Sequence, residues 1–198
     1  WQETIRQAER FVYIESQFFI GSTGPGSGEP KNGIPEAILE RIIRAARAGQ
    51  VFRVYVLIPM HPTGDYVHDL RPRIIMHYEY LTICKGRRSL LERFQTACPG
   101  VDPTEFICFT SLQNWGKLDD FVVHDQIYVH SKLLIADDRV LVVGSANIND
   151  RSMLGARDTE VAVRIEDSQC LEVPLSDLPG QAFLVGGAVH RLRRRLMN

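Results

Sequence analysis

The length, composition and charge of the chain exclude several classes of protein. Its 198 residues, 44% hydrophobic and 24% charged, are typical of an ordinary folded domain or lobe with a core of its own. A formal net charge of −1 gives no global positive field that would favour nucleic acid. No apolar run reaches the length that spans a bilayer. The chain begins at Trp1 without a signal-peptide pattern, so we expect a fragment or a processed chain.

The cysteines do not predict a metal site, because no two of them have C-x-x-C spacing and none pairs with histidines in order. Their even number allows two disulfides, but buried free thiols in a reducing cytosol are the simpler interpretation. The four are Cys84, Cys98, Cys108 and Cys170.

The first third of the chain predicts a βαβ unit. Residues 1–10 have a helical, amphipathic pattern, and residues 11–20 are rich in the β-branched and aromatic residues of a strand. After a Gly- and Pro-rich loop, residues 34–48 predict a helix, and residues 51–59 predict a second strand parallel to the first. The arginines of this helix are expected on its solvated face: Arg41, Arg44 and Arg47.

The middle of the chain predicts helix followed by strand. Residues 71–97 indicate one long helix or a broken pair, and residues 105–110 indicate a third strand. Residues 111–125 are expected to form a polar loop near a site at the strand ends. In that loop, Trp115 and Phe121 either touch lipid or pack beneath the loop.

The last part of the chain predicts a short helix at 148–154, a strand at 158–165 and an amphipathic helix ending near 196. The basic residues of that last helix form either a solvated face or a surface for anionic lipid head groups, the solvated face being the default interpretation. They are Arg191, Arg193, Arg194 and Arg195.

Residues 127–152 carry the chemistry, reading I-Y-V-H-S-K-L-L-I-A-D-D-R-V-L-V-V-G-S-A-N-I-N-D-R-S. They predict two buried antiparallel strands joined by a tight turn, with His130 and Lys132 on one face of the first strand. The hairpin would bring Ser145 and Asn147 back beside them. An imidazole, an ammonium, a hydroxyl and an amide at one strand end suit a phosphate-like anion.

A histidine beside a lysine on a strand is more often a solvated or satisfied pair than a site. However, a lysine on an apolar strand carries a desolvation cost unless an anion meets it. The small, polar stretch at 144–147, at hairpin distance, favours a site, because backbone there could approach a ligand closely.

These residues resemble a known signature. H-x-K-x-x-x-x-D followed by G-S-x-N resembles that of the phospholipase D superfamily, also called the HKD family. The run from 127 to 161 is similar to the second signature of eukaryotic-type, phosphatidylcholine-hydrolysing phospholipase D. Residues 11–19, F-V-Y-I-E-S-Q-F-F, resemble that family's I-Y-I-E-N-Q-F-F segment, with Ser16 where Asn is usual.

The resemblance implies an enzyme without metal or cofactor that uses two such motifs. One histidine forms a phosphohistidine, and the other protonates the leaving group and then activates water. This chain has one motif, because no other histidine is followed by a lysine two residues later. Those histidines are His61, His68, His77, His124 and His190. Residues 1–198 are therefore expected to form a single lobe, the second of a two-lobe enzyme, active when paired with the first lobe or with a second copy of itself.

The resemblance also implies roles for individual residues. His130 is expected to act as general acid and base, while Lys132 and Asn147 hold phosphate oxygens with help from Ser145. Glu160 matches an acidic residue of the family that orients an imidazole, and the resemblance implies that this imidazole belongs to the absent lobe.

Three further residues belong to this expected site. Asp137 completes the catalytic motif, but a carboxylate would repel phosphate, so we expect it to fix the hairpin turn. Glu15 and Gln17 share one face of the first strand; they are either solvated or, as the resemblance favours, supports of the site.

We therefore expect an α/β lobe with a mixed, mostly parallel sheet and helices on both faces. The implied reaction converts phosphatidylcholine to phosphatidic acid and choline, or to a phosphatidyl alcohol, at a membrane surface in the cytoplasm. The phospholipid and the first lobe are the expected partners, and nucleic acid is not. The alternatives are a nuclease of the same superfamily, a phosphatidyl transferase or synthase, and a lobe that binds without catalysis.

Overall fold

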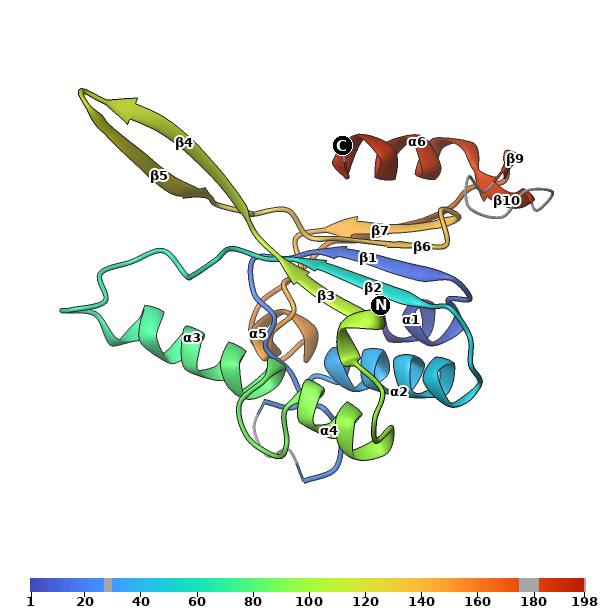
Figure 1. Cartoon of the computed structure of the whole chain (residues 1–198), viewed down its shortest axis with the longest axis horizontal. Coiled ribbons are helices and arrows are strands. Elements are labelled where there is room, and N and C mark those ends of the chain that lie inside the picture. The colour runs from blue at the N-terminus through green and yellow to red at the C-terminus, as the bar shows by residue number, and fades with distance from the viewer. Residues whose placement is uncertain (27–29, 175–181, 198) are drawn as a thin grey trace.

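The computed structural model describes residues 1–26, 30–174 and 182–197, and its centre is a six-stranded sheet (Figure 1). The strand order is β3-β2-β1-β6-β7-β8. In that order, the strands are Ile107–Thr110, Arg53–Leu57, Phe11–Glu15, Leu133–Ala136, Val140–Gly144 and Ala162–Glu166.

The directions of these strands confirm a mixed α/β fold. β1, β2 and β3 pair in parallel, whereas the β1–β6, β6–β7 and β7–β8 pairs are antiparallel. β7 thus runs the same way as β1, β2 and β3, and β6 and β8 run the opposite way. The predicted βαβ unit is present, with α2 (Ile34–Arg47) between β1 and β2.

Helices cover both faces of the sheet, as expected. On one face, α1 (Gln2–Gln7), α2 and α4 (Leu90–Ala97) enclose the larger core, in which Ile14, Ile38 and Phe94 are fully buried. On the other face lies α6 (Gly187–Leu196) (Figure 1). Its Val189 packs against Tyr13 and Ile135. Among the described helices, none is long and apolar enough to cross a membrane.

The segment expected to be a helix or a broken pair is a broken pair, α3 (Leu70–Ile83) and α4. Asp69 caps α3 by accepting a hydrogen bond from Arg71 N at 2.9 Å. A single 3₁₀ turn (Pro103–Glu105) precedes β3, and the expected short helix after the central hairpin is α5 (Asp150–Met153).

Two strands are shorter than the sequence predicts. β1 ends at Glu15, and β6 begins only at Leu133, the residue that pairs with Glu15. Because the chain leaves the sheet after Glu15, the residues before Leu133 have no β1 partner. His130 and Lys132 therefore lie in the connection that enters β6 rather than in a strand.

The expected polar loop at 111–125 is wrong, because the segment forms a β-hairpin of β4 (Leu112–Leu118) and β5 (Phe121–Ile127). The hairpin projects away from the sheet (Figure 1). Trp115 and Phe121 are 70% and 74% exposed, so neither packs beneath a loop. A second unexpected pair of strands, β9 (Cys170–Pro174) and β10 (Ala182–Gly186), precedes α6.

The expectation of a solvated face is also wrong for Arg41, which is 2% exposed. Its guanidinium donates to Ala8 O at 2.6 Å and Glu9 O at 3.0 Å, and lies 3.7 Å from the centroid of the Phe52 ring. These contacts let a cation enter the core because the carbonyls and the ring replace water.

The cysteines differ from expectation in burial. All four are unpaired, but only Cys98 is buried among them, and Cys84, Cys108 and Cys170 are exposed.

Candidate active site

The candidate site lies at the edge of the sheet where β1 and β7 end and β6 begins. Two connecting segments, 16–20 and 145–149, run side by side there. Ile20 N donates to Ile148 O at 2.9 Å, and Ile148 N donates to Ser16 Oγ at 3.3 Å. Ligand sites of α/β sheets commonly form at such carboxyl ends of strands.

Lys132 is the buried cation of this edge, with 8% of its surface exposed. Its Nζ donates to His130 O and, at 3.5 Å, to Gln17 Oε1. Burial lowers the pKa of Lys132, and the charge of Glu160 opposes that shift. In the described part of the chain, no carboxylate forms an ion pair with Lys132, so the ammonium is available to an external anion.

Asn147 directs its amide to the same point. Its Nδ2 donates to Gln17 Oε1 at 3.4 Å, and its buried Oδ1 has no hydrogen-bond partner among the described residues. Lys132 and Asn147 thus already converge on one oxygen atom. Gln17 is itself held by Tyr128, whose hydroxyl accepts from Gln17 Nε2 at 3.0 Å. The structure therefore brings Lys132, Asn147 and Gln17 together.

Ser145 and Glu160 form a second group. Ser145 Oγ donates to Glu160 Oε2 and accepts from Val161 N at 3.0 Å. Hydrogen bonds from Ser145 and Ser152 lower the pKa of Glu160, so its carboxylate is ionised near neutral pH. The Ser145 hydroxyl is therefore committed to Glu160 rather than free for a ligand.

Gly144 has a different function from the close ligand approach that the sequence suggests. A Cβ at Gly144 would lie 2.2 Å from Val161 O and 2.7 Å from Ala162 Cα. The missing side chain therefore admits the backbone of β8, not a ligand.

His130 is exposed, and its ring makes no hydrogen bond within the described ranges. Its backbone oxygen accepts from Lys132, which fixes the main chain beneath the ring. The imidazole is thus free to reach a substrate or a partner, and its orientation is not set by the described part of this chain.

Glu15 lies apart from the Lys132 group and is 6% exposed. One carboxylate oxygen accepts from Tyr13 Oη at 2.7 Å and the other accepts from Ser131 Oγ. Burial and the hydrogen bond to Glu15 raise the pKa of the Tyr13 hydroxyl. Glu15 ties Ser131, between His130 and Lys132, to the end of β1.

Asp137 lies at the opposite end of β6 from Lys132. Its carboxylate accepts from the backbone N–H groups of Glu9, Arg10 and Phe11 at 2.7–3.0 Å. Asp137 and Asp138 both have positive φ, 54° and 56°, in the predicted tight turn. The structure places Asp137 where it joins the β6–β7 turn to the start of β1.

Sequence reasoning missed the supporting hydroxyl groups of Tyr13, Ser16, Tyr128 and Ser131. Ser16 offered a signal, since it stands where the resembled segment has Asn. Tyr128 is two residues from His130, but its neighbour Gln17 is 111 positions away in the chain. No local pattern reveals such a contact.

No group of three or more His, Cys, Asp or Glu side chains is arranged to hold a metal ion in the described ranges. What the edge does offer is a buried ammonium, a convergent amide and an exposed imidazole. Together these can bind a phosphoryl oxygen and exchange a proton beside it.

Several curated phospholipases D are similar to this chain in sequence. The chain is 43% identical over 189 residues to Phospholipase D B of Dictyostelium discoideum, covering 96% of this chain and 15% of that protein. It is 44% identical over 170 residues to Phospholipase D2 of Bos taurus, covering 84% of this chain and 18% of that protein. It is 42% identical over 188 residues to Phospholipase D zeta 1 of Arabidopsis thaliana, covering 92% of this chain and 17% of that protein.

The chain thus spans less than a fifth of the length of these relatives. The family profile described as Phospholipase D matches residues 2–196, almost the whole sequence. The chain therefore belongs to the phospholipase D family.

Proposed function

We propose that this chain forms one catalytic lobe of a phospholipase D that hydrolyses phosphatidylcholine to phosphatidic acid and choline. The observation that carries the proposal is the convergence of Lys132 and Asn147 on one oxygen, Gln17 Oε1. A non-bridging phosphate oxygen beside that point would accept from both donors. The buried, unpaired ammonium then gains the anion that offsets its desolvation.

His130 is the proton carrier in this proposal. A histidine of the first lobe attacks phosphorus, the P–O bond to choline breaks, and the protonated His130 gives its proton to the leaving oxygen. His130 then removes a proton from water, whose oxygen attacks phosphorus and breaks the P–N bond. An alcohol in place of water gives a phosphatidyl alcohol. The exposed, unengaged ring of His130 supports this role.

The other residues have supporting roles. Lys132 and Asn147 hold the phosphate, and Ser145 holds Glu160. The lowered pKa of Glu160 keeps a carboxylate available to accept an N–H from an imidazole of the facing lobe. Asp137 is a positioning residue, because its three N–H contacts fix the strand that enters the site.

The partner is a lobe carrying a first motif, or a second copy of this chain. The presence of a single motif in 198 residues supports a second motif from elsewhere. The small share of each relative that the chain spans, 15–18% in the three compared above, supports the first of these two sources.

The test measures choline release by the isolated chain, by a mixture with the first-motif lobe, and by the full-length enzyme. We expect background release from the chain alone and turnover once the two motifs are together. A full rate from the chain as a monomer, judged by its mass in solution, would overturn the two-histidine mechanism. A full rate from a dimer of the chain would assign the partner to a second copy.

Within the full-length enzyme, we expect His130→Asn to abolish turnover, because the amide cannot give a proton to the leaving oxygen or take one from water. His124→Asn is the matched control, since His124 is likewise exposed but lies on the β5 strand of the projecting hairpin. Near-normal turnover by the His130 variant would remove that residue from the mechanism.

The enzyme is expected to work in the cytoplasm at a membrane surface. Four unpaired thiols support a reducing compartment, and the exposed Arg191, Arg194 and Arg195 of α6 support contact with anionic lipid. Sedimentation with anionic vesicles should weaken for the double variant Arg194→Gln/Arg195→Gln. Arg87→Gln/Arg88→Gln, exposed at another place in the chain, should sediment like the wild type, and equal sedimentation of all three would exclude α6.

A further inference from the structure

The side-chain amide of Gln17 lies between Tyr128 and the two donors of the candidate site. Its Oε1 accepts from Lys132 Nζ at 3.5 Å and from Asn147 Nδ2 at 3.4 Å. Its Nε2 donates to Tyr128 Oη at 3.0 Å. Both ends of the amide are therefore in use, and the contact with Tyr128 is the shortest of the three.

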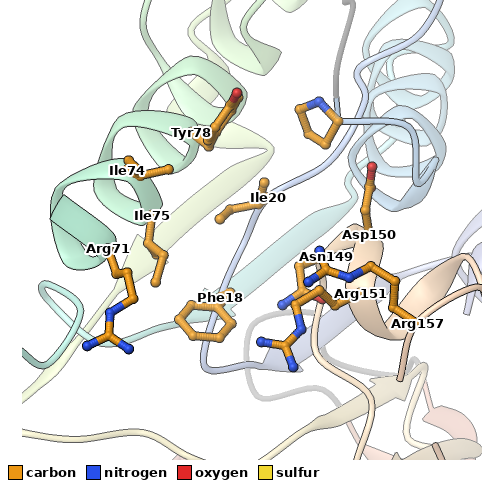
Figure 2. Close-up of a pocket in the computed structure, with 11 residues that line it drawn as sticks. Phe18, Ile20, Arg71, Ile74, Ile75, Tyr78, Asn149, Asp150, Arg151 and Arg157 are labelled. Carbon is orange, nitrogen blue, oxygen red and sulfur yellow. The ribbon is translucent and has the colours of Figure 1, made fainter. Parts of the chain in front are cut away.

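The main chain on either side of Gln17 is fixed by packing and hydrogen bonding. Before Gln17, Ser16 N donates to Leu57 O at 3.1 Å. After it, Phe18 lines a hollow beside α3, and Ile75 of that helix points toward the Phe18 ring (Figure 2). The freedom that remains at Gln17 is therefore rotation of its own side chain.

Lys132 and Asn147 decide which end of the Gln17 amide faces them, because the ammonium and the Nδ2 group are both donors. They hold that end loosely, since their contacts of 3.5 and 3.4 Å exceed the usual range of about 2.7–3.2 Å. The bond to Tyr128 has an ordinary length. The Tyr128 hydroxyl is thus the partner that keeps the Gln17 side chain in place.

The two donors depend on Gln17 for their common direction. If the amide swung away, Lys132 Nζ would keep its contact with His130 O, and Asn147 Nδ2 would lose the acceptor that it shares with Lys132. The donors would then no longer converge before a phosphate arrives. A site aligned in advance binds and stabilises charge better than one that must be aligned during the reaction.

We propose that Tyr128 is a positioning residue for phosphate binding: its hydroxyl holds Gln17, and Gln17 keeps Lys132 and Asn147 directed at one point. The proposal rests on the proposed function and deepens it, because it assigns the alignment of the phosphate donors to a residue outside the motif at 130–137. It requires that Tyr128 matter only while Gln17 is present.

The test is a double-mutant cycle in the full-length enzyme. It measures choline release from a monomeric short-chain phosphatidylcholine, with inorganic phosphate as the inhibitor. Tyr128→Phe removes one hydroxyl and should raise KM and the Ki of inorganic phosphate together, each by about tenfold. Gln17→Met keeps the length of the side chain and should have the same effect. Adding Tyr128→Phe to Gln17→Met should then change neither constant further.

Tyr80→Phe is the matched control, because Tyr80 lies on α3 and is 51% exposed. It should leave KM and Ki at their wild-type values, and an equal rise in this variant would overturn the proposal.

Four other results would overturn the role of Tyr128. The first is a Tyr128 variant with wild-type KM and Ki. The second is a fall in kcat alone, as a smaller folded fraction would give. The third is a raised KM with unchanged Ki, since inorganic phosphate meets the same donors without the rest of the lipid. The fourth is a Tyr128 effect that persists in the Gln17→Met background, because Tyr128 would then act on another group.

These results are distinct from a failure of the proposed function. In each of them the wild-type enzyme still releases choline. A wild-type enzyme that releases no choline from the phospholipid would instead contradict the proposed function.

Discussion

The ammonium of Lys132 carries a desolvation cost in the folded state, and the same burial prepares it to bind an anion. An ammonium that is 8% exposed has lost most of its water, and carbonyl and amide oxygens replace that water only in part. Burial accordingly lowers the pKa of Lys132. A bound phosphate would supply the missing negative charge in a site that is already organised.

The substitution Lys132→Met in the full-length enzyme should therefore separate stability from activity. It keeps the length and apolar stem of the side chain and removes the buried charge, so the free energy of unfolding should be unchanged or higher. Turnover should fall by about a hundred- to a thousandfold, as for loss of one charge-stabilising donor. Denaturant unfolding and choline release measure the two effects.

Lys117→Met, on the exposed β4 strand, is the control and should change neither quantity. A large loss of stability in the Lys132 variant would show that the ammonium stabilises the fold, and would contradict the interpretation as a site cation.

Glu79 predicts a pH dependence of stability. It lies on α3, where its carboxylate accepts from Phe19 N at 3.4 Å, and burial raises its pKa from 4.5 to about 7. A carboxyl group whose pKa is higher in the folded state contributes to stability fully when the pH lies below its pKa in the unfolded state. That contribution is lost as the pH rises through about 7.

Glu79→Gln should remove this pH dependence, because the amide keeps an acceptor for Phe19 N and cannot ionise. Between about pH 5 and pH 8, the wild type should lose up to roughly 3 kcal/mol of unfolding free energy that the variant retains. Urea unfolding at several pH values measures the difference. Glu172→Gln, exposed on β9, should keep the wild-type profile, and an unchanged profile for the Glu79 variant would exclude this carboxyl.

The β6–β7 hairpin is the element around which the others are arranged. Its turn uses two aspartates in two directions: Asp137 binds the start of β1, and Asp138 binds α6. Asp138 is 2% exposed and accepts from His190 Nδ1 at 2.6 Å and Arg193 Nη2 at 2.6 Å. The hairpin thereby connects the start of β1 to the helix on the second face of the sheet.

Asp138→Asn should loosen α6. Burial disfavours the charged form of Asp138, but the hydrogen bonds from Arg193 and His190 outweigh it and lower its pKa. Removing one partner of a buried ion pair should reduce the free energy of unfolding by roughly 3 kcal/mol. Hydrogen exchange should show faster exchange of the α6 amides.

The sign of the pH effect is opposite to that of Glu79. Asp138 stabilises the fold above its unfolded pKa, and this contribution is lost as the pH falls through its lower folded pKa. The variant should therefore lose part of the wild type's acid sensitivity. Asp120→Asn, exposed at the tip of the β4–β5 hairpin, should behave as wild type. Unaltered hydrogen exchange of α6 in the Asp138 variant would contradict a role of the Asp138 ion pairs in holding α6.

The end of β7 makes a second prediction at this scale. Gly144→Ala should push β8 away, because its Cβ would meet the Val161 carbonyl and the Ala162 backbone. We expect a stability loss of about 1–3 kcal/mol, together with lower turnover as Glu160 moves with β8. Gly116→Ala, whose Cβ would meet nothing within 4 Å, is the control. A Gly144 variant with wild-type stability would show that β8 can move away from the added Cβ with no loss of unfolding free energy.

At the scale of the whole molecule, the net charge distinguishes the proposed phospholipase from the alternative of a nuclease. The 23 basic and 24 acidic side chains leave no excess to neutralise a row of DNA phosphates. The isolated chain should therefore show no salt-dependent binding to double-stranded DNA between about 50 and 200 mM salt in a fluorescence anisotropy titration. Tight binding that weakens steeply with salt would favour the nuclease.

The sequence predicted most of the fold where local patterns are strong. The helix at 34–48, the parallel unit around it and the turn at 137–139 appear as expected, because periodicity, Pro35 and turn residues act over short distances. The hairpin at 112–127 was missed, since its polar composition suggested a loop while its stability comes from cross-strand pairs. Arg41 was misplaced because its partners, the carbonyls of residues 8 and 9, are distant in the chain.

The sequence by itself determined which groups were available: an imidazole, an ammonium and an amide at motif spacing, in a chain of balanced charge. Only the tertiary structure decided which of them meet. It directed Lys132 and Asn147 to Gln17, joined Ser145 to Glu160, and sent Asp137 to the far end of β6. The physical reason is that the order of residues along the chain gives the available side chains, whereas contacts between residues 15 to 130 positions apart follow from how the strands pair and where they end.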